Sequence, residues 1–228
     1  MANLKFRSYT NELLDADNIP FKDIKRIMQE LNTINALLGG HAITIDAAKA
    51  FAKENNTLHI CEIGCGGGDN LQAISKIENI NFAFTGIDLK KECIDFAKQQ
   101  YPSLNTNWIV SDYSKVNFGT KPDVIFSSLF CHHFTEEQLI FMLQWMNANS
   151  KKGFFINDLQ RNTLAYFLIK CITKIFSKSY LVKNDAPLSV ARGFHKKEWQ
   201  AIFEQAGIKN YTIQWKWAFR YLIICKNE

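Results

Sequence analysis

The fold of this 228-residue chain is decided by the stretch Leu58-His59-Ile60-Cys61-Glu62-Ile63-Gly64-Cys65-Gly66-Gly67-Gly68. A short apolar run contains one carboxylate near its end, Glu62, and then breaks into a glycine-rich loop. Such a run is typical of a buried parallel strand, and a glycine loop lets a ligand approach the backbone closely. The next residues have helical apolar spacing at Leu71, Ile74 and Ile77. The sequence therefore predicts a strand, a loop and a helix, with a nucleotide-type cofactor at the carboxyl end of the strand.

The spacing of the loop separates the classes of cofactor. A dinucleotide fingerprint has glycines at its first, third and sixth positions, and the loop holds a pyrophosphate. Counted from Gly64, the sixth position is Asp69, whose carboxylate would repel that pyrophosphate. A phosphate loop would end in Gly-Lys-Ser/Thr, which does not follow here. The loop thus favours a cofactor without a phosphate group.

Two more carboxylates follow the next expected strands. Residues 82–88 end in Asp88, and residues 106–111 are followed by Asp112. A carboxylate at the position of Asp88 accepts hydrogen bonds from both ribose hydroxyls, which suits an adenosine cofactor. Alternatively, both acids cap the helices that follow. Acids at three successive strand ends favour the cofactor interpretation.

The pattern acid-x-Gly-x-Gly-x-Gly, followed by these two acids, resembles the class I S-adenosylmethionine-dependent methyltransferases. The resemblance covers residues 50–228 and implies S-adenosylmethionine as the cofactor. It places Glu62 near the cofactor's ammonium end, the glycine loop under its methionine part and Asp112 at the adenine amine. The cofactor-binding residues that it implies are Glu62, Gly64, Cys65, Gly66, Gly68, Asp88, Leu89, Asp112, Tyr113 and Ser128.

The order of elements predicts an α/β fold: a Rossmann-like, doubly wound parallel sheet. We expect strands near 58–63, 82–88, 106–111, 123–129, 152–158, 210–216 and 218–226. We expect helices near 20–38, 43–54, 69–78, 90–100, 136–148 and 195–206. The resemblance implies seven strands with a terminal β-hairpin. Residues 1–50 are interpreted as an N-terminal helical cap and 51–228 as the core, with a lid insertion at about 160–194.

Composition favours a cytoplasmic enzyme. Hydrophobic residues make up 47% of the chain and include 18 phenylalanines, enough for a packed core. Charged residues interrupt the first 15 positions, and no uncharged run is long enough to span a membrane. The six cysteines lack a C-x-x-C pair, so we interpret them as reduced core thiols and predict no metal site.

The lid insertion is strongly basic. From Asp158 to Glu198 there are eight Lys or Arg and three acids, so this segment alone carries a net charge of +5. The remainder is balanced, which argues against a nucleic-acid partner. Three interpretations stay open for a basic amphipathic helix: peripheral contact with a membrane, contact with an acidic partner, or a lid with solvated lysines. The oligomeric state is not predicted.

We expect the catalytic residues to follow the strand at 123–129, and the candidates there are His132 and His133. No Pro-Pro occurs, which argues against the motifs of base-amine methyltransferases. The segment resembles those of small-molecule methyltransferases acting on quinone and polyketide phenols, including enzymes of secondary metabolism. A histidine with a near-neutral pKa suits removal of a proton from a hydroxyl or a phenolic ring, so O- and C-methylation both stay open. The alternative for the pair is a structural role in the loop.

Further alternatives come from other classes of protein. A non-catalytic adenosylmethionine-binding partner protein would keep the three acids without needing a base. An NAD-dependent dehydrogenase would share the first strand and Asp88, but Asp69 opposes it. Asp158 and Arg161 follow the fifth strand, where they either pair as a salt bridge or bind a polar group of the substrate. In the N-terminal cap, Arg7, Tyr9 and His41 are the residues best suited to reach a ligand.

Overall fold

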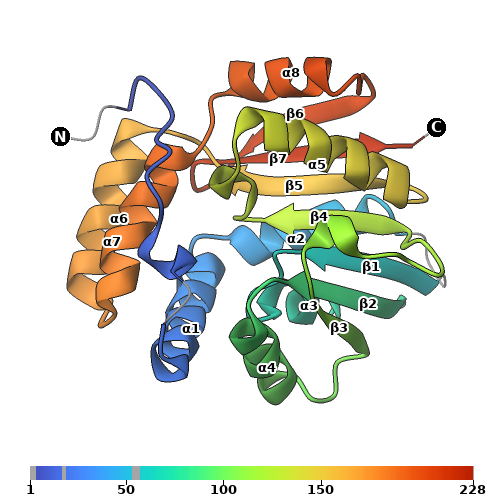
Figure 1. The fold of residues 1–228 in the computed structure, drawn as a ribbon, viewed down its shortest axis with the longest axis horizontal. Helices are drawn as coiled ribbons and strands as arrows, with labels where there is room; N and C mark the ends of the chain where they lie inside the picture. The colour runs from blue at the N-terminus through green and yellow to red at the C-terminus, as the bar shows by residue number, and fades with distance from the viewer. Residues whose placement is uncertain (1–3, 17–18, 53–56, 228) are drawn as a thin grey trace.

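The computed structural model describes residues 4–16, 19–52 and 57–227, which fold around one seven-stranded sheet (Figure 1). The strands are β1 Thr57–Ile63, β2 Asn81–Asp88, β3 Thr106–Val110, β4 Val124–Ser128, β5 Gly153–Leu159, β6 Tyr211–Lys216 and β7 Arg220–Lys226. Their order in the sheet is β3-β2-β1-β4-β5-β7-β6. β1 to β5 are parallel, whereas β7 pairs antiparallel with both β5 and β6. The predicted α/β fold and its terminal hairpin are confirmed.

Helices cover both faces of the sheet. They are α1 Phe21–Leu37, α2 Gly40–Lys49, α3 Asp69–Ile74, α4 Lys91–Gln100, α5 Glu136–Asn149, α6 Thr163–Phe176, α7 Tyr180–Arg192 and α8 Lys196–Gln205. Short 3-10 turns occur at η1 Leu13–Asp15, η2 Tyr113–Lys115 and η3 Cys131–His133. Successive residues of a strand point to opposite faces, so a strand covered by helices on both sides is apolar throughout. β4 is accordingly buried along its whole length.

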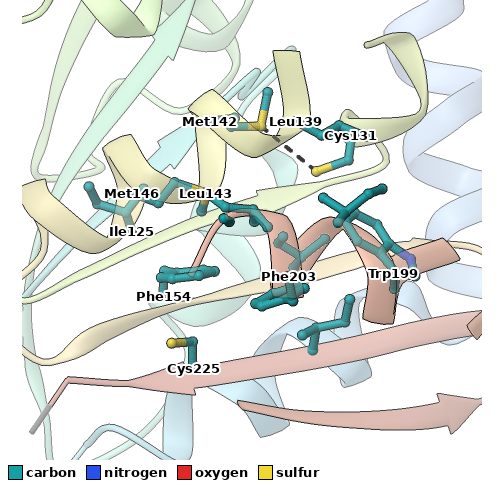
Figure 2. Close-up of a cluster of buried hydrophobic side chains, with 14 of the residues drawn as sticks. Ile125, Cys131, Leu139, Met142, Leu143, Met146, Phe154, Trp199, Phe203 and Cys225 are labelled. Carbon is teal, nitrogen blue, oxygen red and sulfur yellow. Dashed lines mark hydrogen bonds between the residues drawn. The ribbon is translucent and has the colours of Figure 1, made fainter. Parts of the chain in front are cut away.

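The alternation is visible at two phenylalanines of β5. Phe154 packs with Phe203 of α8 and with residues of α5 in one buried cluster (Figure 2). Phe155 points to the other face, where it stacks on Phe126 of β4 at a centroid distance of 4.6 Å and meets α2 and α3. Each buried aromatic side chain contributes about 2–3 kcal/mol through the area removed from water. These two layers fix the strands whose carboxyl ends form the site.

The lid insertion consists of two helices rather than one. α6 and α7 lie side by side at one end of the sheet, with α1 next to them (Figure 1). An N-terminal strap, which we define as residues 4–16, runs along α7, where the Ser8 amide donates to the Ala191 carbonyl at 3.0 Å. The strap and the helix pair thus border the carboxyl ends of the strands.

Some predicted details differ from the structure. α2 begins at Gly40 and ends at Lys49, and residues 53–54 of the predicted helix lie outside the described residues. Cys171 is exposed on α6, so the expectation of core thiols is wrong for it, although the other five cysteines are buried. Within the described ranges, no helix is long and apolar enough to cross a bilayer.

Candidate functional site

A cavity of about 900 Å³ lies at the carboxyl ends of β1, β2, β4 and β5. It is bordered by α1, α6, α7 and the strap. Nearly all of the predicted site residues line it: Glu62, Gly64, Cys65, Gly66, Asp88, Leu89, Asp112, Tyr113, Ser128, His132 and His133. Gly68 does not line it but caps α3 behind the loop. The fold therefore brings most of the predicted residues to one cavity.

Glu62 is a buried carboxylate with one bonded oxygen and one free oxygen. Its Oε1 accepts a hydrogen bond from Asn70 Nδ2 at 2.8 Å, while Oε2 has no partner among the described residues. Burial raises the pKa of Glu62 well above its usual value, and the neighbouring Asp69 and Asp88 raise it further. A buried unpartnered oxygen is costly, so it indicates a donor that arrives with a ligand. The ammonium group of the expected cofactor is such a donor.

The glycine loop fits tightly against two aromatic rings. Gly64 has a φ of +66°, and a Cβ there would lie 2.3 Å from the ring of Phe130. Gly68 has a φ of +77°, and its Cβ would lie 2.5 Å from the ring of Trp108. Side chains rarely adopt such positive φ values. The loop therefore requires glycine both for its backbone conformation and for the space above it.

Asp88 and Asp112 bond to backbone amides as well as facing the cavity. Asp88 accepts from the Gly66 amide at 2.9 Å and the Lys90 amide at 2.8 Å, which ties the loop to β2. Burial raises the pKa of Asp88, although these amides partly oppose the shift. Asp112 caps η2 by accepting from the Ser114 amide at 2.9 Å. Each carboxylate oxygen accepts more than one hydrogen bond, so these contacts leave capacity for a ligand.

The remaining predicted cofactor residues surround these acids. Tyr113 packs edge-to-face on Trp145 with a centroid distance of 5.1 Å, and its burial raises the pKa of its hydroxyl. Ser128 Oγ accepts from Asn157 Nδ2 at 3.3 Å. Cys65 is buried, whereas Leu89 is exposed at the cavity rim. This end of the cavity is therefore acidic at its base and apolar at its edge.

The other end of the cavity contains a chain of three charged groups. His132 donates from Nδ1 to Asp158 Oδ1 at 2.8 Å, and its Nε2 lies 3.5 Å from Glu12 Oε1. All three side chains are almost fully buried. Asp158 also accepts from the Phe130 amide at 3.1 Å, and Glu12 accepts from the Ser189 hydroxyl at 2.6 Å. The imidazole is thereby fixed in orientation, with Nδ1 towards Asp158 and Nε2 towards Glu12.

This environment changes the protonation of His132. Burial alone disfavours the imidazolium, but the carboxylates of Asp158 and Glu12 outweigh it and raise the pKa of His132 to about 9. Conversely, burial would raise the pKa of Glu12 and Asp158, yet their contacts with His132 hold both below their usual values. The expectation of a near-neutral histidine is therefore wrong for His132.

His133 is more accessible and contacts the strap. Its Nδ1 lies 3.2 Å from Asp15 Oδ1, and its Nε2 lies 3.8 Å from Glu12 Oε2. Glu12, His132 and His133 each place one ligand-type atom within 4.8 Å of the others, so among the described residues these three are close enough to hold a divalent ion. One carboxylate and two imidazoles are ligand types that bind zinc or iron.

Two buried arginines hold the histidine turn against the strap and α7. Arg7 donates from Nη2 to the His132 carbonyl at 2.9 Å and from Nε to the Arg192 carbonyl at 2.7 Å. Arg192 donates to the carbonyls of His132, His133 and Thr10. Arg7 thus supports the turn from behind and does not line the cavity. His41 also does not line the cavity but pairs at 2.7 Å with Asp69, which does, and Tyr9 is exposed.

The proposed pairing of Asp158 with Arg161 is wrong. Asp158 binds His132, whereas Arg161 is turned away and pairs with Glu198 of α8 at 2.6 Å. Arg161 also donates to the Gly193 carbonyl at 2.6 Å, and its side chain is only 1% exposed. It therefore anchors the base of the lid rather than a substrate.

Three polar residues of the cavity lining, Glu12, Asp185 and Asn70, were not predicted from the sequence. Glu12 lies in a polar segment with no periodic signal, and only tertiary contacts bring it to His132. Asp185 of α7 was also missed; it accepts from the amides of Leu13 and Leu14, both at 2.9 Å, and so holds η1. Asn70 was detectable in principle, because the helix after a glycine loop returns along the strand that carries Glu62.

Comparison with known protein families gives one match for this chain. Residues 60–153 match the family described as a methyltransferase domain. This range begins in β1 and ends at the start of β5, so it includes the glycine loop, both later acids and the histidine pair. No curated protein sequence matches the chain significantly.

Solved structures share the fold across most of the chain. The plantazolicin methyltransferase BpumL, solved in complex with SAH, has a TM-score of 0.66 and 17% identity, covering 89% of this chain and 90% of BpumL. A SAM-dependent methyltransferase from Aquifex aeolicus has a TM-score of 0.63 and 18% identity, covering 92% and 99%. Human N-acetylserotonin methyltransferase, in complex with SAM, has a TM-score of 0.65 and 13% identity, covering 92% and 57%.

Proposed function

Because this chain is a class I S-adenosylmethionine-dependent methyltransferase, we propose that it methylates an oxygen, or a ring carbon, of a small hydrophobic phenolic metabolite. The observation that carries this proposal is that His132, which is paired with the buried Asp158, lines the same cavity as the cofactor acids. One end of the cavity suits the cofactor and the other suits a weakly acidic acceptor. The cavity volume is in the range usual for small-molecule sites.

The cofactor end fits S-adenosylmethionine. Glu62 would hold its ammonium group with the free Oε2, Asp88 its ribose hydroxyls and Asp112 its adenine amine. When bound, the cofactor supplies an electrophilic methyl group on a sulfonium. The protein's main contribution is then to align the acceptor for in-line attack, and such alignment can lower the barrier by about 7–11 kcal/mol.

The wall between the two ends indicates a hydrophobic acceptor. Apolar side chains from α1, α5 and α6 line it, namely Met28, Leu31, Ile34, Phe141, Ala165, Leu168, Ile169 and Ile172. Burying an apolar ring against such a wall is favourable by roughly 25 cal/mol per Å². The few polar groups at the far end would then fix the ring's hydroxyl.

His132 is proposed as the group that accepts the acceptor's proton. Its pKa of about 9 is close to the value of about 10 for a phenol, so proton transfer between them costs little. An aliphatic alcohol is a far weaker acid, so the same histidine would deprotonate it poorly. The resulting imidazolium stays paired with Asp158, which offsets its charge in the buried site. His133 and Asp15 hold Glu12 beside the pair.

The proposal places the enzyme in the cytoplasm and in secondary metabolism of polyketide-like or quinone-like phenols. The free thiols support a reducing compartment, since no cysteine is disulfide-bonded in the part of the chain that is described. The apolar cavity and the phenol-matched histidine support the substrate class. Attack from oxygen or from the activated ring carbon uses the same deprotonation.

The experiment combines cofactor binding with a screen for methyl transfer. The intact protein is expected to bind S-adenosylmethionine but not NAD in calorimetry, and to label phenols with a radioactive methyl group. His132→Ala should lower kcat by about 10²–10⁴-fold, while the cofactor Kd changes less than twofold. His195→Asn, an exposed histidine at the N-cap of α8, is the matched control.

Two outcomes would contradict the proposal. If His132→Ala and the double variant with His133→Ala retain full transfer, the pair is structural. If the protein binds the cofactor tightly but labels no phenol, quinol or polyketide acid, a non-catalytic adenosylmethionine-binding protein becomes the better explanation.

A further inference from the structure

Helix α6 carries an apolar stripe on its solvent side. Leu164, Phe167, Cys171 and Ile175 are exposed at a spacing of i, i+3, i+7 and i+11, which places them on one helix face. Ile175 is 72% exposed, and the adjoining Phe176 and Tyr180 are 77% and 66% exposed. A continuous row of large apolar side chains on a surface usually marks an interaction site.

Lysines flank this stripe. Lys170, Lys174 and Lys178 are exposed and form no ion pair with any carboxylate in the described ranges. The nearby Glu30 of α1 already accepts hydrogen bonds from the Ser177 hydroxyl and the Lys178 amide. Three uncompensated cations beside an apolar stripe match an anionic lipid surface, because headgroups attract the lysines and acyl chains receive the apolar side chains.

The same helix also forms a wall of the cavity. Ala165, Ile169 and Ile172 line it from the inner side of α6, and Leu168 both lines it and is 43% exposed. The exposed stripe and the acceptor end of the cavity are thus separated by the width of one helix. An apolar molecule leaving a bilayer at α6 would meet an apolar lining without crossing bulk water.

We propose that the α6 stripe lies in the headgroup region of an anionic membrane, and that the methyl acceptor is a lipid-soluble phenol or quinol that reaches the cavity from that membrane. The second part rests on the proposed function, whereas the first part stands on the surface of α6 alone. Length, charge and exposed aromatic side chains together make α6 an interfacial helix, not a spanning one.

Co-sedimentation of the full chain with vesicles tests the docking. Binding is expected to vesicles that contain phosphatidylglycerol and to be weak with phosphatidylcholine alone. Replacing Lys170, Lys174 and Lys178 with Gln should weaken it by the order of 100-fold, because each basic residue contributes about 1 kcal/mol near such a surface. Replacing three exposed lysines outside the lid, Lys49, Lys76 and Lys98, is the matched control and should have a smaller effect.

A second variant tests the apolar stripe. Phe167→Ser with Ile175→Ser should abolish binding while leaving the melting temperature unchanged, since both side chains are exposed. Equal binding to neutral vesicles, or no binding by the intact protein, would overturn the proposal. So would a dimer in vesicle-free sedimentation that this variant dissociates, because a second copy would then cover the stripe.

The acceptor route has its own readout. Transfer to a lipid-soluble phenol presented in anionic vesicles should fall at least tenfold in the lysine variant, while transfer to a water-soluble phenol stays constant. Equal loss with both phenols would overturn the route. Absence of transfer to any phenol by the intact protein would refute the proposed function and leave the vesicle-binding result as a separate finding.

Discussion

Glu12 and His132 face each other across 3.5 Å, from Oε1 to Nε2, although Glu12 precedes the first helix and His132 follows the fourth strand. Asp158 contacts the opposite nitrogen of the same imidazole at 2.8 Å. The histidine is therefore held between two carboxylates that come from separate parts of the chain. Its proton affinity depends on both of them, so the strap takes part in setting the chemistry of the cavity.

Glu12→Gln is expected to shift the pH dependence of methyl transfer. His132 accepts a proton only when neutral, so kcat/KM should rise with pH towards the pKa of about 9 and be lost below it. Removing the Glu12 charge lowers that pKa, so the profile should move to lower pH by about one unit. Glu204→Gln, an exposed acid of α8, is the control. An unchanged profile would show that His132 is not the titrating group.

Glu62→Gln is expected to weaken cofactor binding. The amide keeps the bond from Asn70 but loses the negative charge, which should raise the Kd about 10–100-fold. In the intact protein the pKa of Glu62 is raised, so its carboxyl group loses a proton when the ammonium group of the cofactor binds. Affinity should therefore increase as pH rises through that value, and calorimetry in buffers of different ionisation enthalpy should detect the released proton. The variant should release none; equal release by both would contradict this role.

Gly64→Ala should disable the loop without unfolding the protein. A left-handed conformation costs a residue with a Cβ about 1–2 kcal/mol, and this Cβ would also displace the Phe130 ring. We expect cofactor binding to fall below detection while far-UV circular dichroism stays native. In Gly119→Ala, the added Cβ meets nothing within 4 Å, so binding should be normal. Normal binding by both variants would refute the tight fit.

Arg161→Ala should destabilise the lid. It leaves Glu198 without its partner in a largely buried pair, which should cost about 3 kcal/mol and lower the Tm by roughly 10 °C. Arg26→Ala should cost less, because the Arg26 side chain is half-exposed and its partner Glu30 keeps the hydrogen bonds from Ser177 and Lys178. Equal losses of stability in the two variants would mean that the Arg161–Glu198 pair contributes no more than the pair on α1.

The same pair predicts an acid-dependent loss of stability. Burial opposes the charge of Glu198, but hydrogen bonds from Arg161 and the His195 amide lower its pKa overall. A carboxylate with a lowered pKa contributes stability above its unfolded value of about 4.3, and this is lost as pH falls through the folded value. Denaturant unfolding from pH 6 to pH 3 should show this loss, and Glu198→Gln should reduce it.

Removal of metal ions should leave methyl transfer unchanged. Glu12, His132 and His133 are close enough to bind a divalent ion, but a metal ligand must be deprotonated, and His132 favours its protonated form between two carboxylates. Dialysis against EDTA is therefore expected to preserve activity. Loss that zinc or magnesium restores in the intact protein, but not in Glu12→Gln, would show that these residues form a metal centre.

The pattern of apolar runs, each followed by an acid, was sufficient to predict the sheet and the cofactor end of the cavity. Glu62, Asp88 and Asp112 all follow or end apolar runs, and parallel topology brings such positions together without further information. The acceptor end depends on contacts between distant segments. The polar strap has no periodicity that would place Glu12 at His132, and nothing in the sequence near Arg161 distinguishes Glu198 from the closer Asp158 as its partner. Long-range ion pairs are decided by packing, which local spacing does not encode.

Arg7, Arg192 and Asp185 join the strap, the histidine turn and α7, whereas the glycine loop bonds to β2 and packs against Phe130 and Trp108. The strap and α7 therefore form one unit that supports the acceptor end of the cavity. Grafting the strap together with α6 and α7 from a relative would exchange one wall of the cavity together with Glu12, the strap carboxylate that contacts His132. Transplanting the lid alone would separate His132 from the contacts that orient it, so altered selectivity should require both segments to be exchanged as a unit.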